Sequence, residues 1–133
     1  KDRKDRKAVI IMSDGVDTGS EATLADALEI AQRSDTLVYA IYFAGGGYFG
    51  GAPNGRGILE RLARETGGGF YEITRKVSVE QIFTLIQAEL RSQYSLGFVS
   101  DVPVTVHGFR KLQLSTKEKG LRVQARDRYW ASR

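Results

Sequence analysis

The feature that most constrains the fold is a repeated order in which an apolar, strand-like run is followed by a helix-like segment. Residues 8–12 (AVIIM) and 36–44 (TLVYAIYFA) are continuous apolar runs, as expected for strands covered on both faces. A shorter run at 70–73 (FYEI) indicates a third strand. Parallel strands need crossover connections, which are usually helices. The order therefore predicts an α/β fold whose first part is a three-layer, Rossmann-like half with parallel strands and crossover helices.

Amphipathic spacing and capping residues position three helices. The segment 21–35 has apolar residues at helical intervals, and Ser20 is its expected N-cap. A second helix is predicted from Ile58, with Gly67 as its C-cap. A third follows Ser78, which is spaced from Gln81 as in a capping box.

The last third of the chain changes character. Strand-like segments occupy 94–100, 109–116 and 121–130, and the KEKG sequence at 117–120 is a turn between the last two. Alternating apolar residues in these two segments predict an antiparallel β-hairpin with one solvated face. We therefore divide the chain into an α/β part, residues 1–91, and a β-rich extension, residues 92–133, that packs on it.

Composition excludes several classes of function. The chain has no cysteine, which excludes disulfides, zinc-thiolate sites and cysteine nucleophiles. No apolar run approaches the roughly 20 residues of a membrane-spanning helix, so no membrane segment is expected. Basic residues gather at the two ends, but the alternation in KEKGLRVQARDR favours a solvated sheet face over a nucleic-acid interface. The single histidine, His107, has no triad partners around it and is interpreted as a loop or strand-end residue.

The stretch IMSDGVDTGSEAT at 11–23 supports two interpretations. VDTGS is the signature of an aspartic protease, in which Asp17 would be half of a catalytic dyad. That chemistry needs aspartates on loops between β-strands, whereas a helix-like segment follows Ser20 here. Asp17 is therefore interpreted as a turn or helix-start residue.

The second interpretation concerns Asp14, which directly follows an apolar strand at the carboxyl end, where open α/β sheets bind ligands. Ser13, Asp17 and Thr18 add nearby oxygens of the kind that Mg²⁺ binds. Aspartate is equally favoured in turns. The local residues leave both roles for Asp14 open.

A glycine-rich loop follows the second strand. Gly45, Gly47 and Gly50 match the spacing of a dinucleotide fingerprint, which must run directly into a helix. Seven more residues, including Pro53, precede the expected helix start at Ile58. The spacing favours a surface loop.

Several of these stretches together resemble a known family. KAVIIMSDGVDT, LVYAIYFAGG and LERLARETGGGFYEI are similar to the second half of a von Willebrand factor type A domain. There a strand ending in Ser-Asp-Gly precedes a helix, and a later helix carries the pattern matched here by Leu59 to Gly68. The tail resembles the ending of bacterial proteins related to this type. Asp127 and Arg128 depart from this ending, because those proteins usually have a glycine at the position of Arg128.

The resemblance implies a non-enzymatic protein-binding domain with no catalytic residues. In the family a divalent cation is held by a D-x-S-x-S loop, a threonine and the aspartate before the helix, and an acidic group of the protein ligand completes its coordination. Only that aspartate, Asp14, is present here, and D-x-S-x-S is absent. The resemblance therefore implies a carboxyl-terminal portion with an incomplete metal-ion-dependent adhesion site. Mg²⁺ is expected in the intact domain and not tightly bound by this chain.

Three further expectations come from the resemblance to the family and its relatives. The strand at 8–12 would have a bare edge, which we expect a second copy or a retained N-terminal piece to cover. The glycine loop 45–57 would lie on the same rim as Asp14. An exported location is slightly favoured.

The alternative is an α/β hydrolase-like or nucleotide-binding module in which Asp14 serves as acid, base or metal ligand. A second acidic residue at a strand end would favour it. Glu72 is the nearest candidate, and alternation puts it in mid-strand.

Overall fold

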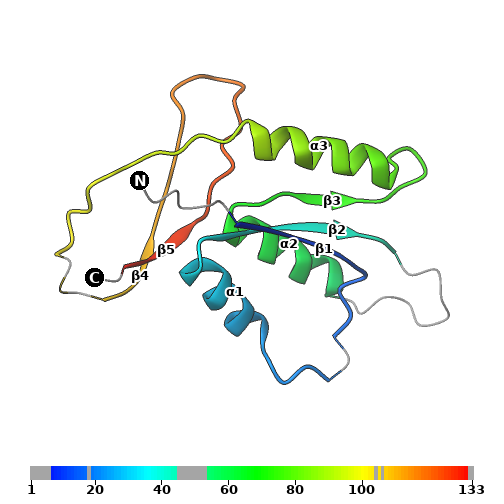
Figure 1. The fold of residues 1–133 in the computed structure, drawn as a ribbon, viewed down its shortest axis with the longest axis horizontal. Coiled ribbons are helices and arrows are strands. Elements are labelled where there is room, and N and C mark those ends of the chain that lie inside the picture. The colour runs from blue at the N-terminus through cyan, green and yellow to red at the C-terminus, as the bar shows by residue number, and fades with distance from the viewer. Residues whose placement is uncertain (1–6, 18, 45–53, 104, 106, 132–133) are drawn as a thin grey trace.

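The fold consists of a parallel three-stranded sheet with three helices and a separate antiparallel pair of strands (Figure 1). The computed structural model describes residues 7–17, 19–44, 54–103, 105 and 107–131. In chain order the elements are β1 (Lys7–Ser13), α1 (Leu24–Arg33), β2 (Thr36–Tyr42), α2 (Gly55–Thr66), β3 (Phe70–Glu72), α3 (Val79–Arg91), β4 (Gly108–Lys111) and β5 (Arg128–Ala131). The prediction of an α/β fold with parallel strands, crossover helices and an antiparallel extension is confirmed at this level.

The parallel sheet has the order β1-β2-β3. Ser13 is the register partner of Tyr42, and Tyr42 is the partner of Glu72. The carboxyl ends of the strands therefore meet at one edge of the sheet, from which the extension containing β4 and β5 is remote (Figure 1).

Alternating residues of β2 hold the three layers together. Val38 and Ala40 pack with α1 and α2 on one face, whereas Tyr39 and Ile41 pack with Ile82 and Ile86 of α3 on the other. Figure 1 shows this arrangement, with α3 above the sheet and α1 and α2 below it. The core residues of β2 are at most 5% exposed, as expected for the central strand of a three-layer packing.

Local capping signals define most helix ends. Ser78 and Gln81 form the expected capping box of α3, and Gly67 ends α2 in the left-handed conformation with φ of 86°. The prediction of Ser20 as the N-cap of α1 is wrong. The N-cap is Thr23, three residues further along the chain. Its hydroxyl accepts the Asp26 N–H and the Asp26 carboxylate accepts the Thr23 N–H, so both of these backbone donors are satisfied.

Strand β1 differs from the expectation of a strand covered on both faces. Val9, Ile10 and Met12 are 48%, 40% and 56% exposed. Among the described residues β1 pairs only with β2, so it is an edge strand. An apolar run predicts burial, but here the cover on one side of the strand is absent from the described part of the chain.

The extension forms less sheet than predicted. Only residues 108–111 and 128–131 pair, with Phe109 opposite Trp130, and the Leu112 N–H donates to the Asp127 carbonyl oxygen beyond them at 2.8 Å. The predicted strand at 94–100 is irregular, and so are residues 112–116 of the predicted strand 109–116 and residues 121–127 of the predicted strand 121–130. Their apolar residues are largely exposed, so alternation in the sequence had no facing layer to stabilise it. A turn does lie at Lys119 and Gly120.

The extension docks at the amino edge of the sheet. A Cβ on Gly67 would lie 2.7 Å from the Arg126 backbone nitrogen, so the two backbones touch there. Arg126 forms an ion pair with Asp35, and the Arg33 guanidinium lies 4.6 Å from the centroid of the Trp130 ring. These contacts fix residues 124–131 against the ends of α1 and α2.

A polar cluster joins α3 to the same docked segment. The Tyr71 hydroxyl donates to the Glu89 carboxylate, and the Gln124 amide donates to the same carboxylate at 3.2 Å. Burial, followed by the hydrogen bond to Glu89, raises the pKa of Tyr71. Burial also raises the pKa of the nearby Tyr39.

Candidate functional site

Asp14 lies where the sequence placed it, immediately after β1 at the carboxyl edge of the sheet. Its carboxylate accepts the Val16 N–H at 3.1 Å, and the Ser13 hydroxyl accepts the Gly15 N–H at 2.9 Å. These bonds fold residues 13–16 into a tight turn in which Asp14 is half-buried. Within the described part of the chain Asp14 forms no ion pair.

The turn is held against the first residue of α2. Gly15 has a φ of 72°, and a Cβ there would lie 2.3 Å from the Gly55 carbonyl oxygen. In the opposite direction, a Cβ on Gly55 would lie 2.5 Å from the Asp14 carbonyl oxygen. Both positions therefore require glycine, because only a hydrogen fits between the two backbones. Sequence reasoning missed Gly55, and its only signal was a glycine three residues before the expected helix start.

Helix α2 begins three residues earlier than predicted, at Gly55 in place of Ile58. Asn54 is its N-cap residue and makes no side-chain capping bond. The glycines of the fingerprint, Gly45, Gly47 and Gly50, lie outside the described residues. The end of this loop, at Gly55, does reach the rim beside Asp14.

Asp17 is a turn residue, in agreement with the sequence analysis. Its carboxylate accepts the Ser20 N–H at 3.0 Å, and its side chain is exposed. The turn leads to the capped start of α1. Asp17 therefore lies between a strand and a helix, whereas the dyad chemistry of an aspartic protease needs a loop between strands.

The prediction that Glu72 lies in mid-strand is wrong, because β3 ends at Glu72 after only three residues. Glu72 is therefore a second acidic residue at the carboxyl edge. Its carboxylate accepts from the Arg56 Nε at 3.3 Å, and Arg56 also pairs with Glu60 at 3.2 Å. The Arg56 guanidinium lies 5.1 Å from the centroid of Phe70, whose ring stacks on Tyr42. Arg56 organises this side of the edge, and no sequence motif had singled it out.

Asp14 and Glu72 do not form one site. They follow β1 and β3, which lie on opposite sides of β2, so two strand spacings, about 10 Å, separate their backbones. Among the described residues, no three carboxylate, histidine or cysteine side chains come together in a way that could hold a metal ion. Asp14 alone offers one carboxylate, fewer ligands than Mg²⁺ or Ca²⁺ needs.

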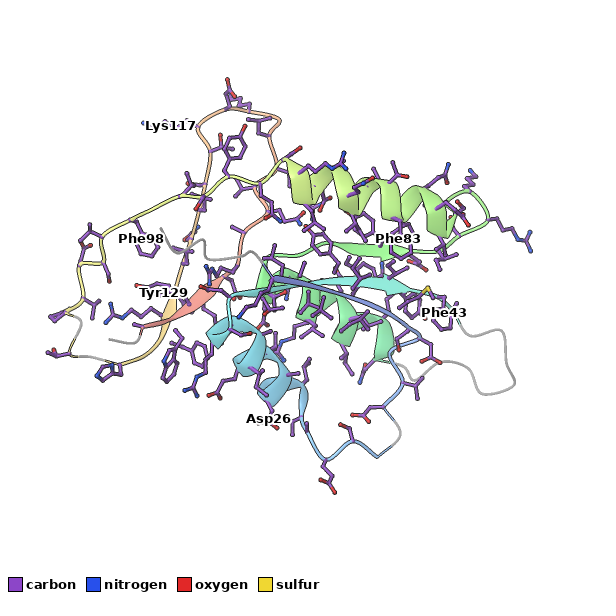
Figure 2. The ribbon with its side chains drawn as sticks, viewed as in Figure 1. Asp26, Phe43, Phe83, Phe98, Lys117 and Tyr129 are labelled. Carbon is purple, nitrogen blue, oxygen red and sulfur yellow. The ribbon has the colours of Figure 1, made fainter. Side chains whose placement is uncertain are left out.

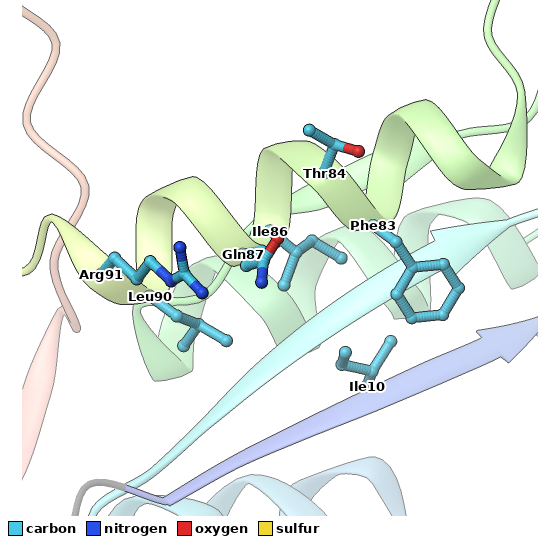
Figure 3. A pocket seen from close by; sticks show the side chains of 7 residues that line it. All are labelled: Ile10, Phe83, Thr84, Ile86, Gln87, Leu90 and Arg91. Atoms are coloured by element: carbon cyan, nitrogen blue, oxygen red, sulfur yellow. The ribbon is translucent and has the colours of Figure 1, made fainter.

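A groove of about 480 Å³ lies between β1 and α3, on the face of the sheet opposite α1 (Figure 3). Ile10 rises from β1 and Phe83 descends from α3 toward it, while Leu90 and Arg91 line its other end. Ile10 and Phe83 are 40% and 44% exposed. Helix α3 thus covers β2 and β3 and leaves the same face of β1 open.

The extension has a hollow of its own, of about 350 Å³, beside Phe98 and Tyr129, whose rings meet edge to face at 5.3 Å (Figure 2). Arg110 is bound to the walls of this hollow, where it donates to the Ser100 hydroxyl and to the Val102 and Pro103 carbonyl oxygens. A hydrogen bond with Ser100, assisted by the charge of Arg110, lowers the pKa of Tyr129. The groups in this hollow therefore mainly bind one another.

Comparison with solved structures gives a neighbour of similar fold, whereas two other comparisons give no match. No protein-family model and no curated protein matches the chain. A solved structure, described as an uncharacterized membrane spanning protein from Vibrio fischeri, is similar with a TM-score of 0.48 and 20% identity. The similarity covers 63% of this chain and 45% of that one. For its part, the described region of the present chain has no helix that is both long and apolar enough to cross a membrane.

Proposed function

We propose that this chain is the carboxyl-terminal part of a protein-binding domain of the von Willebrand factor A type, and that it acts by binding and not by catalysis. In this proposal Asp14 belongs to a divalent-cation site, and further ligands come from a segment not contained in this sequence. The observation that carries the proposal is the position of Asp14: it follows an apolar parallel strand and sits in a turn fixed by contact with the start of α2. Open α/β sheets bind ligands at such edges.

The surroundings of Asp14 support this role in two ways. No basic side chain of the described residues neutralises its carboxylate, so the group can attract a cation. The Ser13 hydroxyl and the Asp17 carboxylate lie within the same short turn region and can bind water around an ion. A partner's acidic side chain would then approach this edge and complete the coordination of the ion, on the rim that Gly55 shares.

Titration of Mg²⁺ into the chain, followed through backbone amide chemical shifts, tests the proposal. Weak binding in the millimolar range is expected, with shifts confined to residues around Ser13, Asp14 and Gly15, since one carboxylate and water do not hold Mg²⁺ tightly. Asp14→Asn should abolish these shifts. Glu21→Gln, which removes an exposed carboxylate further along the same connection, is the matched control and should retain them. Shifts that survive Asp14→Asn, or micromolar affinity for this chain alone, would refute the proposed site.

Two observations favour a second candidate, a nucleotide-binding or hydrolase-like module that uses Asp14. Glu72 provides the second acidic strand end, and the α2 N-terminus beside Gly15 has no side-chain cap. Against it, Glu72 is already paired with Arg56. Titration with ATP in the presence of Mg²⁺ separates the candidates: shifts at Gly55 and Arg56 would favour the module, and their absence favours the binding domain.

A further inference from the structure

The sequence contains a single asparagine, Asn54, and glycine follows it. It also contains a single Asp-Gly pair, Asp14 and Gly15. Both pairs can form a succinimide, because a glycine has no side chain to hinder the attack of its backbone nitrogen on the preceding side chain. The fold brings the two pairs together, since a Cβ on Gly15 would lie 2.3 Å from the Gly55 carbonyl oxygen. Their surroundings differ, and this difference decides which pair reacts.

The Asp14 pair is held by hydrogen bonds on both of its reacting groups. The Gly15 N–H, whose nitrogen would be the nucleophile, donates to the Ser13 hydroxyl at 2.9 Å. The Asp14 carboxylate, which would be attacked, accepts the Val16 N–H at 3.1 Å. Ring closure must break both bonds, because the nitrogen has to lose its proton and the carboxyl group has to turn toward it. The folded turn therefore opposes the reaction at Asp14.

The Asn54 pair lacks these restraints. Asn54 is exposed, its side-chain amide makes no hydrogen bond with the described residues, and none of them accepts the Gly55 N–H. The Gly55 atoms nearest to the Cβ position of Gly15 are its Cα and carbonyl atoms, so this contact does not involve the nitrogen. Asn54 precedes the helix, and turning its Cα–C bond for the attack breaks at most one described hydrogen bond, from the Ile58 N–H to its carbonyl oxygen.

We propose that Asn54 is a site of spontaneous deamidation in the folded protein. Base removes the Gly55 amide proton, the nitrogen attacks the Cγ of Asn54, and the bond from Cγ to the side-chain nitrogen breaks, so that ammonia leaves and a succinimide forms. Water then opens the ring at either carbonyl and leaves aspartate or isoaspartate at this position. The net reaction consumes one water and releases one ammonia, and it needs no enzyme, metal ion or oxidant.

The products change the rim that Gly55 shares with Asp14. Aspartate in place of Asn54 adds a negative charge at the amino end of α2, where the helix dipole favours it and where Asn54 makes no capping bond. Isoaspartate adds a methylene group to the backbone directly before Gly55, and so displaces the residue that fits against the Asp14 turn. The reaction occurs without a bound cation and does not rest on the proposed function.

Peptide mapping of the folded chain, and of the chain unfolded in guanidinium chloride, tests the proposal. After incubation at mildly alkaline pH, cleavage at lysine and arginine puts Asp14 on peptide 8–33 and Asn54 on peptide 34–56. Mass spectrometry follows loss of the Asn54 amide, and isoaspartate-specific methylation follows isoaspartate in both peptides. Folding should slow the reaction at Asp14 roughly tenfold or more, since two hydrogen bonds must open, and slow that at Asn54 by less. Equal or greater protection of Asn54 would overturn the proposal.

Two variants separate the chemistry from a change in fold. Asn54→Gln keeps the amide but requires a larger ring, so ammonia release from the folded chain should fall to background. Release that survives Asn54→Gln would place the reacting amide elsewhere and refute the proposed site. Ser13→Ala removes the acceptor of the Gly15 N–H and should speed isoaspartate formation in peptide 8–33 while leaving Asn54 unchanged. If that peptide is unaffected, the contrast between the two pairs fails.

Discussion

The contact between Gly15 and Gly55 makes a specific prediction about stability. In Gly15→Ala the new methyl group would sit 2.3 Å from the Gly55 carbonyl oxygen, in a residue whose φ is 72°. The left-handed conformation costs a residue with a Cβ roughly 1–2 kcal/mol, and forcing a methyl group into a packed position costs roughly 1–3 kcal/mol. We therefore expect Gly15→Ala to lower the free energy of unfolding by about 2–5 kcal/mol, a large share of the 5–15 kcal/mol typical of a domain.

Three other glycines separate the two contributions. Gly19 has a φ of 92° with open space around it, so Gly19→Ala should cost only the conformational part, about 1–2 kcal/mol. Gly55 lies in the ordinary helical conformation, and a Cβ added to it would lie 2.5 Å from the Asp14 carbonyl oxygen. Gly55→Ala therefore isolates the steric part of the cost. Gly57 lies in the same helix with nothing near its Cβ position, and Gly57→Ala should stabilise the protein by up to about 1 kcal/mol.

The assay is urea denaturation of the four variants and the unmodified chain, followed by circular dichroism. Gly57→Ala also corrects Gly55→Ala for the gain in helix propensity. The reasoning would be refuted if Gly15→Ala were no less stable than Gly19→Ala, or if Gly55→Ala behaved like Gly57→Ala. Either result would mean that the start of α2 does not hold the Asp14 turn in solution.

Three further predictions concern the rest of the chain. Ser78→Ala removes the N-cap of α3 and should cost about 1 kcal/mol in the same denaturation assay, whereas an unchanged midpoint would argue against the capping box. The raised pKa of Tyr71 means that the folded state holds the hydroxyl proton more tightly than the unfolded state does. The resulting contribution to stability is complete below the ordinary pKa of 10.0 and is lost as pH rises through the raised pKa of the folded state. Tyr71→Phe should therefore make the unfolding midpoint less sensitive to alkaline pH, and an identical pH profile would contradict this. Arg33→Ala should red-shift the fluorescence of the single tryptophan, Trp130, while Arg64→Ala, the control on α2, should not; equal spectra would mean that the extension does not dock on α1.

The sequence located much of the fold because its signals are local. The apolar run at 36–44 becomes the buried strand β2, and Ser78 with Gln81 caps α3 as their spacing predicted. Gly67 ends α2 because only the left-handed conformation closes that helix and glycine adopts it readily. Asp14 was also placed correctly at the end of β1, since the apolar run stops just before it.

The predictions from sequence were wrong where the local structure depends on residues that are neighbours in space but not in sequence. Strand β3 ends at Glu72 because only Ala40 to Tyr42 of β2 pair with it, and this brings Glu72 to the edge beside Arg56. In the extension, residues 112–127 alternate like strands but have no facing layer, so only the base of the hairpin pairs. Alternation alone does not create the packing surface that a strand needs.

Taken by itself, the sequence determined the three parallel strands and the three helices, and it put one carboxylate after the first strand. Only the tertiary structure decided that Gly55 would lock the Asp14 turn, that Arg56 would bind the second acidic strand end, and that β1 would lie at an open edge. The physical reason is range. Propensity, periodicity and capping act within a few residues, whereas close backbone contact, ion pairing across the sheet and exposure of an edge depend on segments that are distant in the chain.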